Sequence, residues 1–439
     1  MNWEPAYIIL IIISTLVDYS ICLRIPNSSE QRKKRLLAIS LITNLGILFV
    51  FKYFNFFTDN VYDILNGFGL NLSKPTLNLL LPVGISFYTF QTLSYSIDVY
   101  RGKLAPEKHL GKFALYVSFF PQLVAGPIER ATSLLPQLQK NDQKINYENF
   151  VVGLTQFVHG LFKKVVVADT LSIYVDTIYA APGSFSGFTL LFATILFAIQ
   201  IYCDFSGYTD MAIGCARMLG YKLMENFNLP YYSVSVTEFW RKWHISLSSW
   251  INDYLFLPMA KKYVAMWSKN GMIFSLLFTF TIIGLWHGAN WTFVLFGVLH
   301  GLVLAFEFST KKRRKKIGKK LGKKVWTVFG WFGFMFFYLI SLILFRSDSI
   351  TNAWIYIKRM LFNKDLINLK ILDIQVFFNI IFAASVLILI DHFIMRKVSY
   401  QQMFNSKTKY WLVSFNLFLL LLVILFGVSE GSQFIYFQF

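Results

Sequence analysis

Cysteine is rare in this sequence, which holds three such residues among 439. Cys22, Cys203 and Cys215 all lie in apolar stretches, and none of them belongs to a Cys-x-x-Cys pair. The spacing therefore excludes a disulfide framework and a cysteine-based zinc site. We interpret each cysteine as a small buried hydrophobic residue.

Charged residues are also rare, at 15% of the chain, whereas hydrophobic residues make up 56% and aromatic residues 18%. This apolar share is well above that of a soluble domain, so we expect an all-α polytopic membrane protein. Long linkers rich in proline, glycine or serine are missing, which predicts a single membrane-embedded unit over residues 1–439. Segments of roughly 17 to 25 apolar residues can cross a bilayer. About ten candidate crossings follow, at residues 6–23, 36–57, 76–99, 150–170, 188–203, 272–287, 290–308, 325–345, 376–395 and 411–428.

Acidic residues are outnumbered by basic ones, 23 against 42, which gives a net charge of +19. Such an excess is typical of nucleic-acid-binding proteins, but here it is concentrated at Arg32–Arg35 and in the loop 311–324, directly beside apolar segments. That placement follows the positive-inside rule. We therefore expect membrane lipid and no nucleic acid as a partner, with both clusters in the cytoplasm and the C-terminus outside. A solvated anchoring face is the simpler interpretation of the 311–324 run, and a specific anionic-lipid site is the alternative.

The segment Phe119–Arg130 is apolar but too short to cross a bilayer, and Pro121, Gly126 and Pro127 interrupt it. Irregular backbone at membrane depth is tolerated only where protein or water satisfies its polar groups. The sequence leaves open a re-entrant, cavity-lining segment and an ordinary interfacial loop.

Two carboxylates, Asp204 and Asp210, follow the apolar segment 188–203. Two carboxylates alone make a weak cation site, so we expect no bound metal. Helix capping by Asp204 or by Ser206 is the simplest interpretation, and cavity lining is the alternative.

Residues 235–250 begin with a capping-box pattern, because Glu238 follows Ser235 by three positions. We expect one helix from this point. Its apolar face would carry Phe239, Trp243, Leu247 and Trp250, and a neighbouring face would carry Trp240, His244 and Ser248. Interleaved Arg241 and Lys242 favour an amphipathic helix at the membrane interface, with His244 as an interfacial histidine.

His287 stands inside the apolar run Met272–Phe308. A titratable group at membrane depth is costly and is a candidate functional group. A straight helix over this run would be roughly 55 Å long, much longer than the bilayer core is thick, so we expect a break at Gly288–Asn290. His287 would then lie where two helix ends meet and could act as a general base. A structural histidine that bonds a backbone carbonyl is the alternative, and His300 is expected to pack or to form a hydrogen bond.

Two tryptophan-histidine motifs carry a family resemblance. They are Phe239–Ser248, with the sequence FWRKWHISLS, followed by Trp250, Asp253–Leu255 and Pro258, and Gly284–Trp291, with the sequence GLWHGANW. On these motifs the chain resembles the membrane-bound O-acyltransferase family, and within it the branch that O-acetylates alginate. Asp204–Met211, Gly126–Ile128 with Arg130 and the closing run Phe434–Phe439 match that branch as well.

The resemblance implies that His287 is the catalytic histidine and that His244 is a second functional histidine. It further implies re-entrant and interfacial helices around a central tunnel, through which a cytoplasmic acyl donor reaches an extracytoplasmic acceptor. The residues that we expect to line the site or tunnel are Trp240, Arg241, Trp243, Ser248, Asp253, Trp286, Asn290, Asp204 and Asp210. The donor would be acetyl-CoA or another acyl thioester, used as a substrate, with no permanently bound cofactor.

The acceptor implied by the resemblance is a polysaccharide outside the bacterial cytoplasmic membrane. The acetyl group would reach it directly or through an extracytoplasmic SGNH-type acetyltransferase. Two other functions stay open. One is D-alanyl transfer to a cell-wall polymer, as in another branch of the same family. The other is a polytopic transporter or flippase, which explains the helices and the intramembrane histidine but not the two motifs together.

Overall fold

The computed structural model describes residues 5–70, 73–77, 79–140, 145–363, 382, 385–386, 409–428 and 434–435. Within these residues every regular element is a helix, as the apolar composition predicts. The chain divides into two compact units, one of residues 1–145 with 220–224 and one of residues 146–219 with 225–439. The single unit over residues 1–439 stays a prediction.

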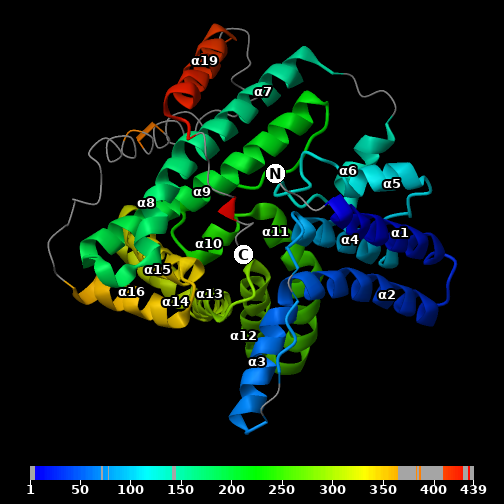
Figure 1. The fold of residues 1–439 in the computed structure, drawn as a ribbon, viewed down its shortest axis with the longest axis horizontal. Helices are drawn as coiled ribbons and strands as arrows, with labels where there is room; N and C mark the ends of the chain where they lie inside the picture. The colour runs from blue at the N-terminus through cyan, green and yellow to red at the C-terminus, as the bar shows by residue number, and fades with distance from the viewer. Residues whose placement is uncertain are drawn as a thin grey trace. The chain divides into compact units, whose positions relative to one another are not determined.

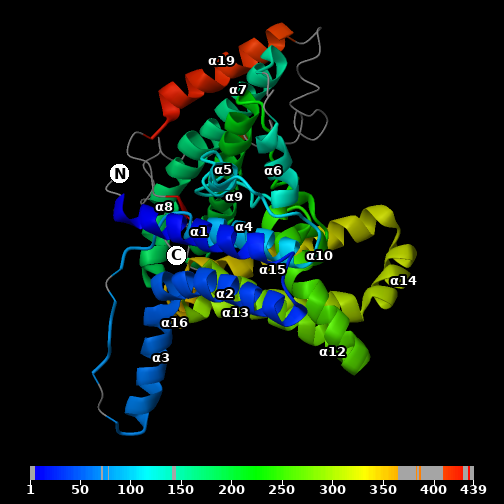
Figure 2. The same ribbon diagram turned by 90° about the vertical axis from the view of Figure 1, so that its right-hand side faces the viewer.

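The first unit is built on three helices that lie side by side, α1 (Ile8–Arg24), α2 (Glu30–Leu48) and α4 (Ile85–Tyr100) (Figure 2). Its other elements are η1 (Pro5–Tyr7), η2 (Phe49–Tyr53), α3 (Phe54–Gly67), α5 (Leu110–Val117) and α6 (Ala131–Gln139). Asp18 is buried among the three helices and accepts hydrogen bonds from Ser40 at 2.6 Å and Asn44 at 2.9 Å. These bonds offset the cost of burying its carboxyl group.

The second unit contains the longest helix, α9 (Gly187–Met218), which runs against α7 (Tyr147–Leu161) (Figure 1). Glycines line their contact, with Gly153 opposite Gly214 and Gly160 opposite Gly207, and a Cβ at any of these positions would overlap the opposite backbone. The remaining elements are η3 (Phe162–Ala168), α8 (Asp169–Ala180), η4 (Pro182–Ser184), η5 (Pro230–Tyr232), α10 (Val236–Trp240), α11 (Ile245–Ile251), η6 (Asn252–Phe256), α12 (Leu257–His287), α13 (Trp291–Ser309), α14 (Lys311–Leu321), α15 (Lys323–Arg346), α16 (Ile350–Phe362) and α19 (Lys409–Phe426).

α12 and α13 form an antiparallel hairpin. Gly284 faces Gly297 across it, and a side chain on either would overlap the opposite helix. α12 itself turns sharply at Ser268, which has φ 50° and ψ −122°. The second leg of α12 is therefore the part that reaches His287.

The basic run expected as the loop 311–324 forms helix α14 instead. Lysine and arginine are good helix formers, and Gly322, with φ 79°, separates α14 from α15. Figure 2 shows α14, in yellow, projecting from the ends of α13 and α15.

Six described helices are long and apolar enough to cross a membrane, namely Glu30–Gly67, Tyr147–Ala180, Gly187–Met218, Ile245–His287, Trp291–Ser309 and Lys323–Arg346. Each coincides with one predicted crossing. The crossing at 76–99 is wrong in its first part, because α4 begins only at Ile85, after Pro82 and the left-handed Gly84 at φ 77°. α1, with 17 residues, covers most of the predicted crossing 6–23, and α19, with 18 residues, covers most of 411–428. The crossing 376–395 lies almost wholly outside the described residues, so the total of about ten stays a prediction.

Candidate active site

His287 lies at the last position of α12, where the chain turns into α13. Gly288 has an extended backbone, and the Asn290 side chain caps α13 by accepting a hydrogen bond from the Thr292 amide at 3.0 Å. The predicted break at Gly288–Asn290 is thus confirmed. Asn290 also donates to the Asp348 carbonyl at 2.8 Å, which ties the turn to the end of α15.

Aromatic rings surround the His287 imidazole, which is 3% exposed. Its ring centroid lies 4.9 Å from that of Trp286, 5.2 Å from Phe345 and 5.9 Å from Phe296, each in an edge-on geometry. Edge-to-face packing is a favoured arrangement for such rings. The side chains of α13 and α15 therefore set the orientation of the imidazole.

α10 begins as its sequence predicts. Ser235 Oγ accepts a hydrogen bond from the Glu238 amide at 3.1 Å, and Glu238 accepts one from the Val234 amide at 3.0 Å. Burial raises the pKa of the Glu238 carboxyl, but its ion pair with Lys242 at 2.7 Å and the Val234 bond outweigh burial, so its pKa is lower than usual.

The single amphipathic helix expected from this start is wrong. α10 ends at Trp240, and the chain turns before α11, with His244 in the left-handed conformation at φ 45° and ψ 54°. The turn is held by Asn226, whose side-chain oxygen accepts from the Ser246 amide at 3.0 Å and the Ser246 hydroxyl at 2.8 Å. These contacts with a distant segment override the local helical pattern.

His244 is fully buried and is not an interfacial residue. Its Nδ1 lies 3.1 Å from the Asn226 side-chain oxygen, an acceptor, so Nδ1 carries the proton in the neutral ring and Nε2 carries the lone pair. The Phe205 ring meets the imidazole edge-on, with centroids 4.6 Å apart.

Trp286 brings the two histidine motifs together. Its ring centroid lies 6.0 Å from that of His244 and 4.9 Å from that of His287. The motifs come from separate elements, the turn after α10 and the end of α12, and they share one buried indole.

A third histidine joins this aromatic cluster. Trp240 donates its indole N–H to His300 Nδ1 at 3.1 Å, and His300 Nε2 lies 3.2 Å from the Ser341 hydroxyl. Phe296 contacts both His300, at 4.4 Å between centroids, and His287. The expectation that His300 packs or forms a hydrogen bond is confirmed, but its bond to Trp240 carried no sequence signal because 60 residues separate the pair.

The helix cap predicted at Asp204 or Ser206 is wrong, because α9 continues past both residues to Met218. Asp204 and Asp210 instead form ion pairs with η3, Asp204 with Lys164 at 2.7 Å and Asp210 with Lys163 at 2.9 Å. Buried charges require such partners. The two lysines lie on a π-helical segment, a rare geometry that occurs often at functional sites.

Asp204 also binds a segment from the far end of the chain. Its carboxylate accepts a hydrogen bond from the Ile435 amide at 2.7 Å. The neighbouring Phe434 ring packs against Phe205 at 5.9 Å and Tyr208 at 5.2 Å between centroids. Because Phe205 contacts His244, this segment is linked to the histidine through one ring.

The other predicted site residues do not gather around the histidines. Trp243 is buried against Phe227 and Phe239, and the Ser248 hydroxyl donates to the Trp243 carbonyl at 3.2 Å. Asp253 and Arg241 are exposed, and Arg241 lines a separate pocket. The central tunnel stays a prediction.

A family model described as the MBOAT, membrane-bound O-acyltransferase family, matches residues 106–347, a range that includes both histidine motifs. A Pseudomonas aeruginosa protein named "Probable alginate O-acetylase AlgI" is 38% identical over 358 residues, which cover 80% of this chain and 65% of that protein. The chain thus matches slightly less than two thirds of the length of that relative.

Two further relatives have names that refer to other polymers. A "Peptidoglycan O-acetyltransferase" from Helicobacter pylori is 34% identical, over 82% of this chain and 71% of that protein. A "Teichoic acid D-alanyltransferase" from Bacillus subtilis is 29% identical, over 55% of this chain and 62% of that protein.

Proposed function

The chain belongs to the membrane-bound O-acyltransferase family, and on this premise we propose that it O-acetylates an extracytoplasmic polysaccharide with an acetyl group from a cytoplasmic thioester. The observation that carries the proposal is the contact of one buried indole, Trp286, with both His244 and His287. Because two histidines from different elements lie against one ring, the arrangement supports a site that binds two substrates.

In the proposed reaction His287 acts as the general base. Its imidazole takes the proton of the acceptor hydroxyl while the oxygen attacks the thioester carbonyl. The tetrahedral intermediate then breaks its C–S bond, and the imidazolium returns the proton to the leaving thiolate. A positioned base typically contributes about 10² to 10⁴ in rate. Backbone N–H groups at Gly288–Asn290 would stabilise the oxyanion, since they lie beside His287 where one helix ends and the next begins.

Acetyl-CoA is the donor that we propose, bound as a substrate and released as CoA. Lys261 and Lys262, both exposed on the first leg of α12, supply positive charge that suits a phosphate-bearing donor. His244 would position this donor, because its Nδ1 is engaged by Asn226 and its ring orientation is therefore defined.

The acceptor that we propose is a hydroxyl-bearing polysaccharide outside the bacterial cytoplasmic membrane. The names of two relatives, which refer to alginate and peptidoglycan, support this class of acceptor. Transfer would occur directly or through an extracytoplasmic SGNH-type acetyltransferase. D-alanyl transfer is the second candidate, supported by the teichoic acid relatives, which are less similar and match less of the chain.

Labelled donors separate these functions. The purified full chain in lipid vesicles should release CoA from labelled acetyl-CoA and pass the label to a polysaccharide or to an SGNH-type partner. Label transferred only from a D-alanyl thioester would favour the second candidate. Movement of polymer or lipid without any covalent change would indicate a transporter and contradict acyl transfer.

The direction of transfer depends on topology, which we propose from the basic clusters. A cysteine introduced at exposed Lys316 should react with an impermeant reagent only after the cytoplasmic face is opened. One introduced at exposed Ile350, at the start of α16, should react from outside. The reverse pattern would invert the donor and acceptor sides.

A further inference from the structure

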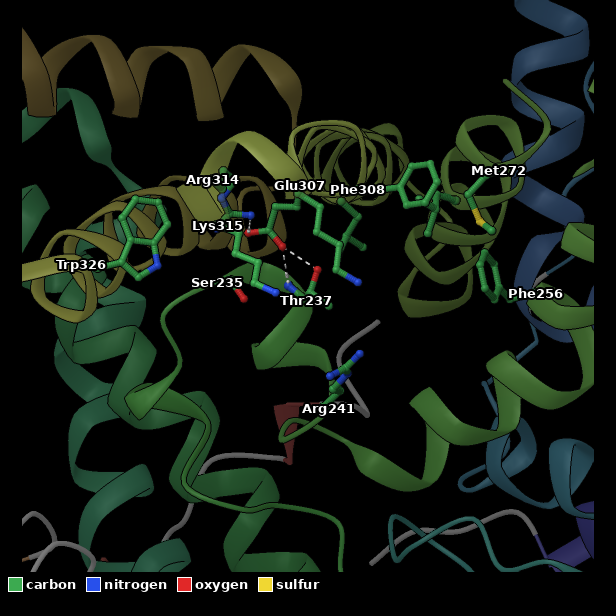
Figure 3. Close-up of a pocket in the computed structure, with 13 residues that line it drawn as sticks. Ser235, Thr237, Arg241, Phe256, Met272, Glu307, Phe308, Arg314, Lys315 and Trp326 are labelled. Carbon is green, nitrogen blue, oxygen red and sulfur yellow. Dashed lines mark hydrogen bonds and ion pairs between the residues drawn. The ribbon is translucent and has the colours of Figure 1, made fainter. Parts of the chain in front are cut away.

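A pocket of about 550 Å³ lies in the second unit, at the end of the α12–α13 hairpin that carries the basic helix α14. Figure 3 draws the 13 residues that line it, and none of them is a histidine. The pocket therefore differs from the aromatic cluster around His244 and His287. Its size is in the range of ordinary ligand sites.

One side of the pocket is strongly basic. Its lining includes Lys311, Arg314 and Lys315 of α14 and Arg241 of the turn after α10. Figure 3 labels Arg314, Lys315 and Arg241 among them. The carboxylate of Glu307 is the one acidic group among the lining residues, so four cations and one anion leave a formal charge of +3. A pocket with this charge selects anions.

Glu307 pairs with one of the four cations, Arg314, and leaves the charge of the other three uncompensated. It is buried, accepts hydrogen bonds from the Val236 amide at 3.1 Å and the Thr237 amide at 2.9 Å, and lies 3.5 Å from Arg314. Its acceptor capacity is thus used to hold the start of α10. Within the part of the chain that the structure describes, Arg241, Lys311 and Lys315 make no ion pair.

The pocket also has an apolar side. Figure 3 shows Met272, Phe256 and Phe308 on the side away from Arg314 and Lys315. Leu276 of α12 and Leu304 of α13 also line the pocket. The two helices are candidate membrane spans, and the basic helix α14 directly follows the second of them. A small soluble anion would use only the charged side, whereas a phosphate joined to a hydrocarbon chain would use both sides.

We propose that this pocket binds an anionic phospholipid, with the headgroup phosphate among Arg241, Lys311 and Lys315 and an acyl chain against the wall formed by α12 and α13. The basic residues predict that the pocket lies at the cytoplasmic side of the membrane, where the lipid leaflet is negatively charged. Charge and apolar contact together hold a lipid more firmly than either does alone. The site goes beyond acyl transfer and does not depend on it.

The experiment is native mass spectrometry of the purified full chain with phosphatidylglycerol and phosphatidylcholine of identical acyl chains. The wild type should retain one phosphatidylglycerol at concentrations where phosphatidylcholine is lost. The variant Lys311→Gln with Lys315→Gln should reduce this retention at least fivefold. The matched control, Lys319→Gln with Lys320→Gln on the same helix but outside the pocket, should retain the lipid. An equal loss in the control would overturn the proposal, since the attraction would then come from the whole basic helix.

The apolar side is tested separately. Leu276→Trp, which fills the pocket, should reduce retention, whereas Phe278→Trp, at an exposed position of the same helix, should not. Melting temperatures of all variants identify any that fail to fold. Displacement of the lipid by CoA or by inorganic phosphate would also overturn the proposal, because a soluble anion would then be the ligand of the pocket. Lipid retention is read without any activity assay, so its failure is distinguishable from failure of acyl transfer.

Discussion

His287 and His244 are both buried and both contact Trp286, yet the chain holds them in different ways. His287 ends a long helix, and aromatic rings of α13 and α15 set its orientation by shape. His244 lies in a turn with a left-handed backbone, and a hydrogen bond to Asn226 sets its orientation. This difference supports the division of roles that we propose, in which His287 would transfer the proton and His244 would position the donor.

Replacement of His287 should have the largest effect. His287→Ala removes the proposed base, so kcat should fall by at least about two orders of magnitude, and a higher donor concentration should not restore it. The measurement is acetyl transfer by the purified variant in lipid. His109→Ala, a replacement at the N-cap of α5 in the first unit, is the matched control and should stay active. A folded His287→Ala protein with near wild-type kcat would contradict the assignment.

Replacement of His244 should affect donor use more than the chemical step. His244→Asn is the suitable variant, because asparagine tolerates the left-handed backbone at φ 45° better than alanine does. We expect a higher KM for acetyl-CoA and a partial loss of activity that rising donor concentration relieves. An unchanged KM with a collapsed kcat would place both histidines in the chemical step and remove the difference between them.

Replacement of Asn226 should reproduce the His244 defect in weaker form. Asn226→Ala removes the acceptor that orients the His244 ring and leaves the Ser246 amide without its bond, a loss worth about 1–3 kcal/mol. The donor KM should rise and the melting temperature should fall. A double variant with His244→Asn should raise KM no further than the worse single variant, because both act on one contact. Strict additivity would show that Asn226 acts elsewhere.

Replacement of Phe434 should have the smallest effect. Phe434→Ala removes a ring that contacts Phe205, the neighbour of His244. Aromatic pairs contribute about 0.5–1.5 kcal/mol, so the donor KM should rise by less than about tenfold. Phe418→Ala, at an exposed position of α19, is the control. A kcat effect as large as that of His287→Ala would mean that the segment supports the base and not the donor.

Local sequence signals predicted the parts of the site that depend on neighbouring residues. The capping box at Ser235 is one example, because a side chain that caps its own helix is recognisable within a single segment. The break at Gly288–Asn290 is another, because it follows from one apolar run that is too long for a bilayer. The same local reasoning was wrong at His244, where helical spacing continues but the chain turns.

The sequence itself thus determined the apolar helices, the basic flanks and the helix break before α13. Hydrophobic length and capping residues act within a few turns of one helix. Only the tertiary structure decided that Trp286 contacts His244, that Asn226 turns the chain at His244 and that Asp204 and Asp210 form ion pairs with η3. Each of these contacts joins residues that are distant in the chain, and their geometry depends on how the helices pack against one another.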